Sequence, residues 1–307
     1  MTDFDPAAAF PELLELRAAV TRRDWPAIAA LFAGLTDPED QAFAAGIVAE
    51  VPGSEGFLGE AAQREPGTLA RTLYGARLIV AGWRIRTAAR AKDVSREQFE
   101  AFHDHLRRAE RVLIEVTAED PANAPAWARR ITTNRGLQLG QNEARRRYDR
   151  LSRHVPDLYA AQSGIVQQFC PKWSGSVEKV YAFGMECMRG GRDGSLGALA
   201  LLEAHFEISL ELGGVERDGY WRRPQVRAEL DEAAHRSVRH PAFRATGYRA
   251  RTAHGTFALA YHLAGDRAAA RPHFEATGGH GAGAYWQYIS GDETAAFKAA
   301  MARAMKA

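Results

Sequence analysis

Apolar residues recur every three or four positions along most of the chain, which is the period of an amphipathic helix. Two short helices of this kind are indicated between Pro11 and Leu35. Asp24 precedes Trp25-Pro26 at the start of the second, which predicts an aspartate N-cap and a proline in the first helical turn. No stretch alternates β-branched and polar residues between Asn-Gly or Asp-Gly turns, so we expect almost no β-strand.

The same pattern predicts three more helices before residue 120. One begins near Pro38, and a longer one covers residues 68–91. Ser95 and Gln98 have the spacing of a capping box and open the next long helix. Asp120-Pro121 ends that helix, because proline cannot continue the hydrogen-bond pattern. The first third of the chain is therefore expected to consist of helices joined by short turns.

Three residues further on have the spacing of a known repeat. Ala144, Tyr148 and Pro156 reproduce the second half of the tetratricopeptide signature, and Trp127 lies one residue from an aromatic position of its first half. The glycine and tyrosine positions of the first helix are not matched. This stretch resembles a tetratricopeptide repeat, which implies that a small alanine lets two helices approach while the aromatic residue fills the space between neighbouring pairs.

A second unit with these spacings occurs near the end of the sequence. Its matching positions are Tyr261, the Gly265-Asp266 turn, Ala270 and Phe274. Ala282 stands where the repeat has proline. Residues 11–35 resemble the repeat more loosely, around the Asp24-Trp25 turn. These resemblances imply stacked helix pairs, since one pair alone cannot bury its apolar face.

A different resemblance covers residues 170–184. Trp173-Ser174-Gly175-Ser176, followed by a helix with Tyr181 and Phe183, is similar to a segment of bacterial helical proteins grouped as a domain of unknown function. This resemblance implies a helical fold and brings no known activity with it.

Together these patterns predict an all-α protein, an irregular tetratricopeptide-like α-solenoid of antiparallel helix pairs. We expect a single array over residues 1–307, with sub-lobes at about 1–120 and 121–307. The alternative is an antiparallel helical array without true repeats, because the helices differ in length.

Composition restricts the functions that such a fold could have. The chain carries 40 basic and 38 acidic residues, a balance that argues against a dedicated nucleic-acid-binding protein. Its two cysteines, Cys170 and Cys187, favour a reducing compartment, so a cytoplasmic location is expected. Residues 1–10 contain no Lys or Arg and lack the start of a signal peptide. No apolar run approaches the roughly 18 residues that span a membrane, so no membrane partner is expected.

No motif indicates catalysis, a metal site or a cofactor. The clusters that could bind a metal have the wrong spacing, because His103 and His105 point in different directions on a helix and His254 and His262 lie two turns apart. His273 could approach either of the latter two from a packed helix. The glycine-rich residues 278–283 follow a helix rather than a strand, which favours a flexible connection over a dinucleotide site.

Two groups of arginines are candidates for binding. One crowds a short helix and consists of Arg145, Arg146, Arg147, Arg150 and Arg153. The other extends from Arg217 to Arg251, with nine arginines against four acidic residues. It includes Trp221, Arg222 and Arg223 in a predicted loop. Such a basic patch could hold an acidic peptide, a phosphate or single-stranded nucleic acid, or it could be a solvated helical face.

The main functional hypothesis is a protein-binding or peptide-binding scaffold, which the sequence favours over an enzyme. In the register of the repeat, the inner wall of a groove would present Arg129, Arg130, Thr133 and Asn134. Resemblance to tetratricopeptide proteins implies that such positions hold a peptide carboxylate, for which the planar arginine fork is suited. The first alternative is an enzyme or biosynthetic accessory factor with a pocket of His, Arg and Trp. A weaker alternative is a phosphate or nucleic-acid contact through residues 217–251.

Overall fold

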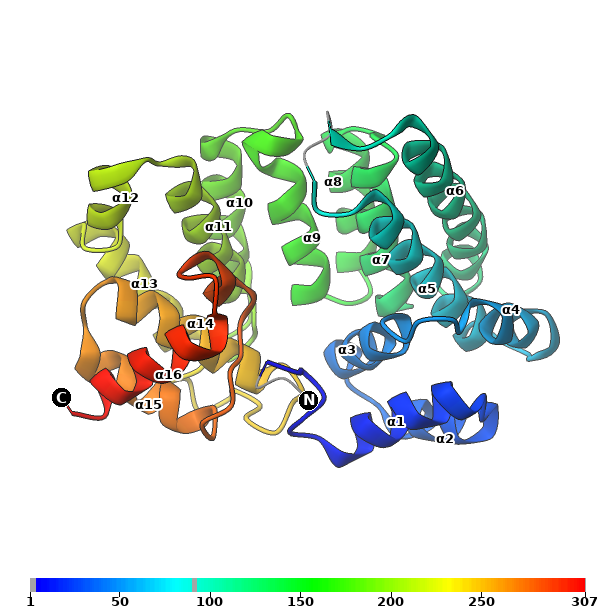
Figure 1. Ribbon diagram of the computed structural model, residues 1–307, viewed down its shortest axis with the longest axis horizontal. Coiled ribbons are helices and arrows are strands. Elements are labelled where there is room, and N and C mark those ends of the chain that lie inside the picture. Colours follow the sequence, from blue (N-terminus) through cyan, green and yellow to red (C-terminus); the bar gives the residue numbers. More distant parts are fainter. Residues whose placement is uncertain (1–3, 90–92, 307) are drawn as a thin grey trace. The chain divides into compact units, whose positions relative to one another are not determined.

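The computed structural model describes residues 4–89 and 93–306, which form sixteen α-helices and no β-strand (Figure 1). The all-α prediction is therefore confirmed. No helix of the described residues combines the length and the hydropathy needed to cross a membrane.

The chain divides into two compact units. The N-terminal unit contains residues 10–168, and the C-terminal unit contains residues 169–307 together with residues 1–9. The expected division near residue 120 falls inside the N-terminal unit, because the helix before that point packs closely on the helix after it.

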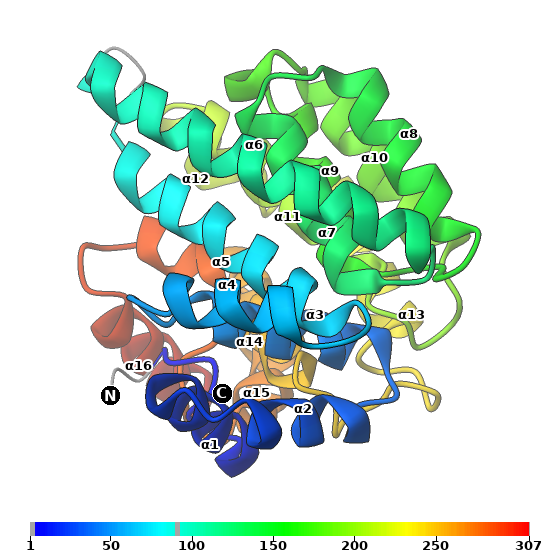
Figure 2. The same cartoon turned by 90° about the vertical axis from the view of Figure 1, so that its right-hand side faces the viewer.

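The described residues of the N-terminal unit form nine helices. They are α1 (Pro11–Arg22), α2 (Trp25–Gly34), α3 (Pro38–Ala49), α4 (Glu55–Arg64), α5 (Leu69–Arg86), α6 (Arg96–Glu119), α7 (Ala124–Gly136), α8 (Gln141–Ser152) and α9 (Tyr159–Phe169). The long helices α5 and α6 pack against each other, and α7 packs on both (Figure 2). Leu78, Ile79, Phe102, Leu106 and Leu113 fill the space between α5 and α6. The helix α8 packs on α7.

Local signals at the helix ends are confirmed. The Asp24 carboxylate accepts a hydrogen bond from the Ala27 backbone nitrogen at 3.1 Å, and Ser95 and Gln98 form the predicted capping box. The helix predicted over residues 68–91 ends earlier, at Arg86, because Thr87 adopts a φ of 64° that a helix cannot contain. Residues 90 and 91 lie outside the described residues.

The C-terminal unit is built around an almost fully buried helix. Its elements are the 3-10 turn η2 (Pro171–Trp173), α10 (Val177–Gly190), α11 (Ala198–Glu211), α12 (Gly214–Tyr220), α13 (Pro224–Arg236), α14 (Ala250–Leu263), α15 (Arg267–Ala276), the 3-10 turn η3 (Ala284–Tyr288) and α16 (Glu293–Ala304). The central helix α11 contacts α10, α12, α13 and α14, and α15 packs between α14 and α16. This central position explains the apolar run Leu196 to Leu202 in the sequence.

The segment Trp173-Ser174-Gly175-Ser176 forms a tight turn before α10. A Cβ atom at Gly175 would lie 1.8 Å from the Phe169 carbonyl oxygen, so only glycine fits there. Ser176 caps α10 by accepting from the Lys179 backbone nitrogen at 3.3 Å. Cys170, which precedes the turn, and Cys187 on α10 are both buried, and they are not joined in a disulfide.

The repeat-like positions are buried in both units, as predicted. On α8 Ala144 is 0% exposed and Tyr148 is 8% exposed, while Phe274 on α15 is 0% exposed. Asp266 caps α15 by accepting from the Ala269 backbone nitrogen at 3.0 Å, after Gly265 with a φ of 78°. Since these residues mark a tight helix–turn–helix in each unit, they organise the packing around α8 and α15.

Candidate functional site

The structure places three of the four predicted groove residues inside the N-terminal unit. Arg130, Thr133 and Asn134 on α7 are 9%, 0% and 0% exposed. All three make hydrogen bonds within the unit, so they face its interior rather than a groove. Arg129, one residue earlier, is half-buried beside Gly46 of α3.

Arg130 belongs to a buried ionic network. The carboxylate of Glu110, on α6, lies 3.0 Å from the Arg130 guanidinium and 2.9 Å from that of Arg147, on α8. Thr133 donates to the second carboxylate oxygen, and Thr117 accepts from Arg130 at 2.7 Å. One acidic side chain therefore joins α6, α7 and α8. Desolvation lowers the pKa of the Arg130 guanidinium, and the negative charge of Glu110 opposes this lowering.

Asn134 holds the turn between α7 and α8. Its side-chain nitrogen donates to the Gly140 carbonyl oxygen at 2.9 Å and to the Gln168 side chain of α9 at 3.0 Å. Gly140 has a φ of 91°, which favours glycine at this corner. Asn134 is therefore buried and links the turn before α8 to α9 through hydrogen bonds.

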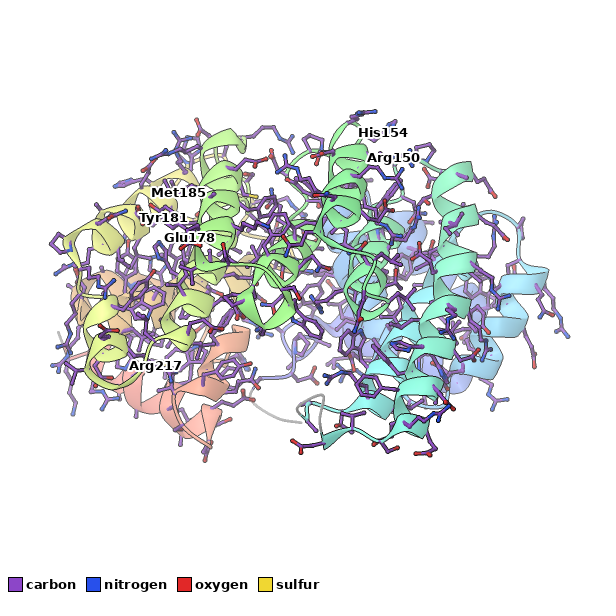
Figure 3. All side chains as sticks on the ribbon, turned by 90° about the horizontal axis from the view of Figure 1, so that it is seen from above. Arg150, His154, Glu178, Tyr181, Met185 and Arg217 are labelled. Atoms are coloured by element: carbon purple, nitrogen blue, oxygen red, sulfur yellow. The ribbon has the colours of Figure 1, made fainter. Side chains whose placement is uncertain are left out.

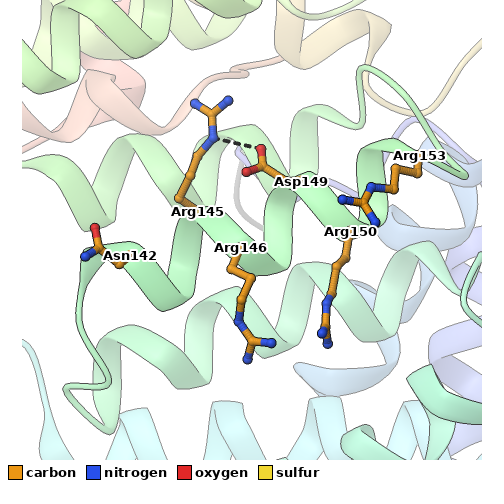
Figure 4. Close-up of a pocket in the computed structure, with 6 residues that line it drawn as sticks. All are labelled: Asn142, Arg145, Arg146, Asp149, Arg150 and Arg153. Atoms are coloured by element: carbon orange, nitrogen blue, oxygen red, sulfur yellow. Dashed lines mark hydrogen bonds and ion pairs between the residues drawn. The ribbon is translucent and has the colours of Figure 1, made fainter.

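The two faces of α8 have opposite characters. Its inner face follows the helical spacing of Ala144, Arg147, Tyr148 and Leu151, all of them buried. Its outer face carries Asn142, Arg145, Arg146, Asp149, Arg150 and Arg153, which we name the α8 arginine surface. These six residues line an open hollow of about 400 Å³ (Figure 4).

Internal carboxylates hold two of the four arginines on this surface. Arg145 pairs with Asp149 at 2.8 Å, and Arg146 pairs with Glu143 at 2.6 Å. Burial by itself raises the pKa of Glu143, but hydrogen bonds from Arg147 and Arg146 outweigh it and lower that pKa below its ordinary value. Glu143 therefore stays ionised and keeps Arg146 extended along α8.

The other two arginines are available. Arg150 and Arg153 are exposed, and neither forms an ion pair or hydrogen bond with another residue of the described chain. Both lie at the C-terminal end of α8, where the helix dipole favours positive charge. Figure 4 shows Arg146 and Arg150 extending from the same side of the helix. Sequence reasoning found this cluster, but it could not separate the buried Arg147 from the accessible members.

The second basic patch is less accessible than its sequence indicates. Trp221 is 3% exposed and packs against Phe206 with ring centroids 4.6 Å apart, so it cannot stack on a ligand. Arg222 and Arg223 are exposed, and the Arg223 guanidinium lies 5.1 Å from the centre of the Tyr220 ring. Three further arginines of this patch are paired with Asp266, Glu232 and Asp231, namely Arg227 at 3.0 Å, Arg236 at 3.3 Å and Arg239 at 3.7 Å.

Sequence reasoning missed a polar cluster inside the C-terminal unit. His205, on α11, lies with Nδ1 2.7 Å from the Tyr220 hydroxyl and Nε2 3.1 Å from a Glu229 oxygen. Tyr181 donates to the other Glu229 oxygen, and Gln225 donates to it at 2.9 Å. Figure 3 shows Tyr181 along α10. The only signal was a histidine following the apolar run that ends at Leu202.

Burial and hydrogen bonds shift the pKa values of two members of this cluster. Burial alone raises the pKa of Glu229, but hydrogen bonds from His205, Tyr181 and Gln225 outweigh it and lower that pKa to about 2. Burial also raises the pKa of the Tyr220 hydroxyl above its ordinary value. Through its hydrogen bonds the cluster joins α10, α11, α12 and α13.

The C-terminal histidines separate into two environments. Nδ1 of His254 lies 3.1 Å from Nδ1 of His273, whereas His262 stacks on Trp286 with ring centroids 6.3 Å apart. Among the described residues, no three side chains of His, Cys, Asp or Glu converge as metal ligands would. His273 instead stacks on the rings of Phe257 and Tyr261, with ring centroids 5.3 and 5.5 Å away.

Comparison with known proteins adds no relationship to this geometry. No family model, no curated protein and no solved structure gives a significant match to this chain.

Proposed function

We propose that this protein is a helical binding scaffold and that its α8 arginine surface holds an acidic segment of a partner protein. The observation that carries the proposal is the pair of exposed guanidinium groups, Arg150 and Arg153, beside an open hollow and without a partner in the described chain. Exposed like charges on one helix face repel each other, and a bound carboxylate relieves that repulsion.

The chemistry of the surface fits carboxylates. Arginine presents a planar fork that can donate two parallel hydrogen bonds to one carboxylate. Arg145 and Arg146 already hold such groups from Asp149 and Glu143. Arg150 and Arg153 offer the same geometry to a partner. The inner face of α8 is fixed by the Glu110 network, so the surface is organised before a ligand arrives.

The same surface disfavours a nucleic acid. Asp149 lines the hollow and Glu143 pairs with Arg146 of the same lining, so a continuous phosphodiester chain would meet negative charge there. The near-neutral chain as a whole supplies little long-range attraction for a polyanion. A short protein segment can place its carboxylates beside Arg150 and Arg153 and avoid both acidic residues.

Two finer expectations belong to this proposal. The tetratricopeptide-like stacking of helix pairs is supported by the buried Ala144, Tyr148, Ala270 and Phe274 in two tight helix–turn–helix units. A location in the cytoplasm is supported by Cys170 and Cys187, which are not joined in a disulfide. The enzyme alternative has less support, because the cluster of His205, Glu229, Tyr181 and Tyr220 is hydrogen-bonded internally.

The proposal is tested with a fluorescent helical peptide that carries glutamate at every fourth position. The double variant Arg150→Glu/Arg153→Glu should weaken its binding by about tenfold or more, the loss expected for one or two charged hydrogen bonds. The control is Arg107→Glu/Arg111→Glu, which makes the same charge change at two exposed positions on α6. The control should change the affinity less than about twofold.

Three outcomes would contradict the proposal. Equal effects of the two double variants would show that only net charge matters. A single-stranded oligonucleotide that competes with the peptide and binds more tightly would favour a nucleic-acid surface. If Arg129→Ala weakens peptide binding more than Arg150→Glu/Arg153→Glu does, the predicted groove on α7 would be the better candidate for the binding site. If the proposal holds, the unaltered chain retains partner proteins from a cell extract. The Arg150→Glu/Arg153→Glu variant should lose these proteins, and the Arg107→Glu/Arg111→Glu control should still retain them.

A further inference from the structure

The glycine-rich residues 278–283 contain glycines of two kinds. Gly278, Gly279 and Gly283 have φ values of 63°, 78° and 97°, a backbone region in which other residues are strained. Gly281 does not lie in this region, so its backbone conformation is open to any residue. Another reason must account for glycine at position 281.

That reason is the ring of Phe4. A Cβ atom at Gly281 would lie 2.3, 2.4 and 2.7 Å from three ring carbons of Phe4. Such distances are far below van der Waals contact, so any side chain at position 281 would expel the ring. Residues 4 and 281 are distant in sequence, and the contact between them is invisible to a reading of local pattern.

The Phe4 ring also meets the aromatic core of the C-terminal unit. It lies edge-on to Phe297 of α16, with ring centroids 5.8 Å apart. Phe297 packs in turn on Phe274 and Trp286, with centroids 5.3 and 5.2 Å away. These three aromatic residues are almost completely buried. An edge-on ring contact of this kind adds to the stabilisation from apolar burial.

The residues after Phe4 continue the contact. Ala7 is 0% exposed, and its backbone nitrogen donates to the Asp5 carboxylate at 3.0 Å. Burial lowers the pKa of Arg251, on α14, and the nearby Asp5 carboxylate partly offsets this lowering. Residues 4–9 thus belong to the C-terminal unit, although the chain continues directly from them into α1 of the N-terminal unit.

We propose that Gly281 and Phe297 form an acceptor site for one aromatic side chain, and that segment 4–9 is its built-in ligand, with Phe4 as the anchor. In this proposal residues 278–283 form one wall of a binding site and are not a flexible connection. The segment acts as a strap, because seating Phe4 orders residues 278–283 against α14. Gly255 of α14 lies so close to these residues that a Cβ atom at position 255 would lie 2.3 Å from the Ala282 carbonyl oxygen.

The test is a double-mutant cycle in the full chain. Phe4→Ala, Gly281→Ala and the combined variant are compared by thermal unfolding and by hydrogen exchange at the backbone amides of Ala7 and Ala8. Gly281→Ala should speed exchange at both amides by about tenfold or more, because the added methyl group unseats the strap. In the Phe4→Ala background, Gly281→Ala should change the exchange rates of these two amides and the midpoint of thermal unfolding very little.

Gly291→Ala is the matched control. Gly291 also lies outside the left-handed region, and nothing lies within 4 Å of its missing Cβ atom, so its substitution should leave both amides protected. Additive effects of Phe4→Ala and Gly281→Ala would overturn the proposal, as would unchanged exchange at Ala7 and Ala8 in Gly281→Ala. If Gly281→Ala does not fold, recovery of folding in the combined variant supports the site, and failure to recover overturns it.

Discussion

The Nδ1 atoms of His254 and His273, on neighbouring helices of the C-terminal unit, lie 3.1 Å apart. One ring must donate and the other accept, because two unprotonated nitrogens would repel each other. Burial, with smaller contributions from His254 and Arg239, lowers the pKa of His273 to about 3, and burial lowers the pKa of His254 below its ordinary value. The pair is therefore held neutral in the folded protein.

This pair should make the C-terminal unit sensitive to acid. Between pH 6.5 and 3 the unfolded chain binds a proton at His273 and the folded chain does not, so stability should fall as the pH falls through this window. Each such proton contributes a slope of up to about 1.4 kcal/mol per pH unit. His273→Gln should flatten the dependence measured by urea unfolding across this range. His280→Gln, at an exposed position, should leave it unchanged.

A second pH dependence is expected from Glu229. Its pKa of about 2 lies below the ordinary 4.5, so the stability that it contributes is complete above pH 4.5 and is lost between pH 4.5 and 2. Glu229→Gln should remove the part of the acid transition that falls in this lower window. The measurement is the midpoint of urea unfolding at pH 5, 4 and 3. An unchanged acid transition in the variant would show that Glu229 is not held ionised by His205 and Tyr181.

Loss of Glu110 should destabilise the N-terminal unit strongly. Glu110→Ala leaves Arg130 and Arg147 buried near each other without their shared carboxylate. The expected loss of unfolding free energy is about 3–5 kcal/mol, the range for breaking a buried ion pair from one side. Glu115→Ala, at an exposed position on the same helix, should cost less than about 0.5 kcal/mol. Equal losses would mean that the network does not join α6, α7 and α8.

The repeat-like aromatic residues should also contribute strongly to stability. Phe274→Ala and Tyr148→Ala each remove a buried ring and should cost about 3–5 kcal/mol in unfolding free energy. Tyr288→Ala, at a position that is 50% exposed, is the comparison for a surface ring. Denaturant unfolding monitored by helical circular dichroism measures all three. Losses below about 1 kcal/mol at positions 148 and 274 would show that these rings do not hold the helix pairs together.

Sequence by itself determined the features that depend on near neighbours. The Asp24 cap, the Ser95–Gln98 capping box and the turn at Gly265-Asp266 each involve residues no more than three apart, so their chemistry is visible in the order of residues. The burial of Tyr148 and Phe274 was expected from the resemblance to tetratricopeptide repeats, whose spacing also links residues only a few positions apart. An arginine cluster on α8 could be found, because it is continuous in the chain.

Only the tertiary structure decided which polar residues are free to bind. Arg130 and Arg150 have the same chemistry and lie on similar short helices, but Glu110 from another helix fills the fork of Arg130, and no described residue fills that of Arg150. The pairing of Phe4 with Gly281 was equally hidden. A buried charge or ring contacts whichever segment the fold brings near it. The spacing of neighbouring residues in the sequence does not show which distant segment that will be.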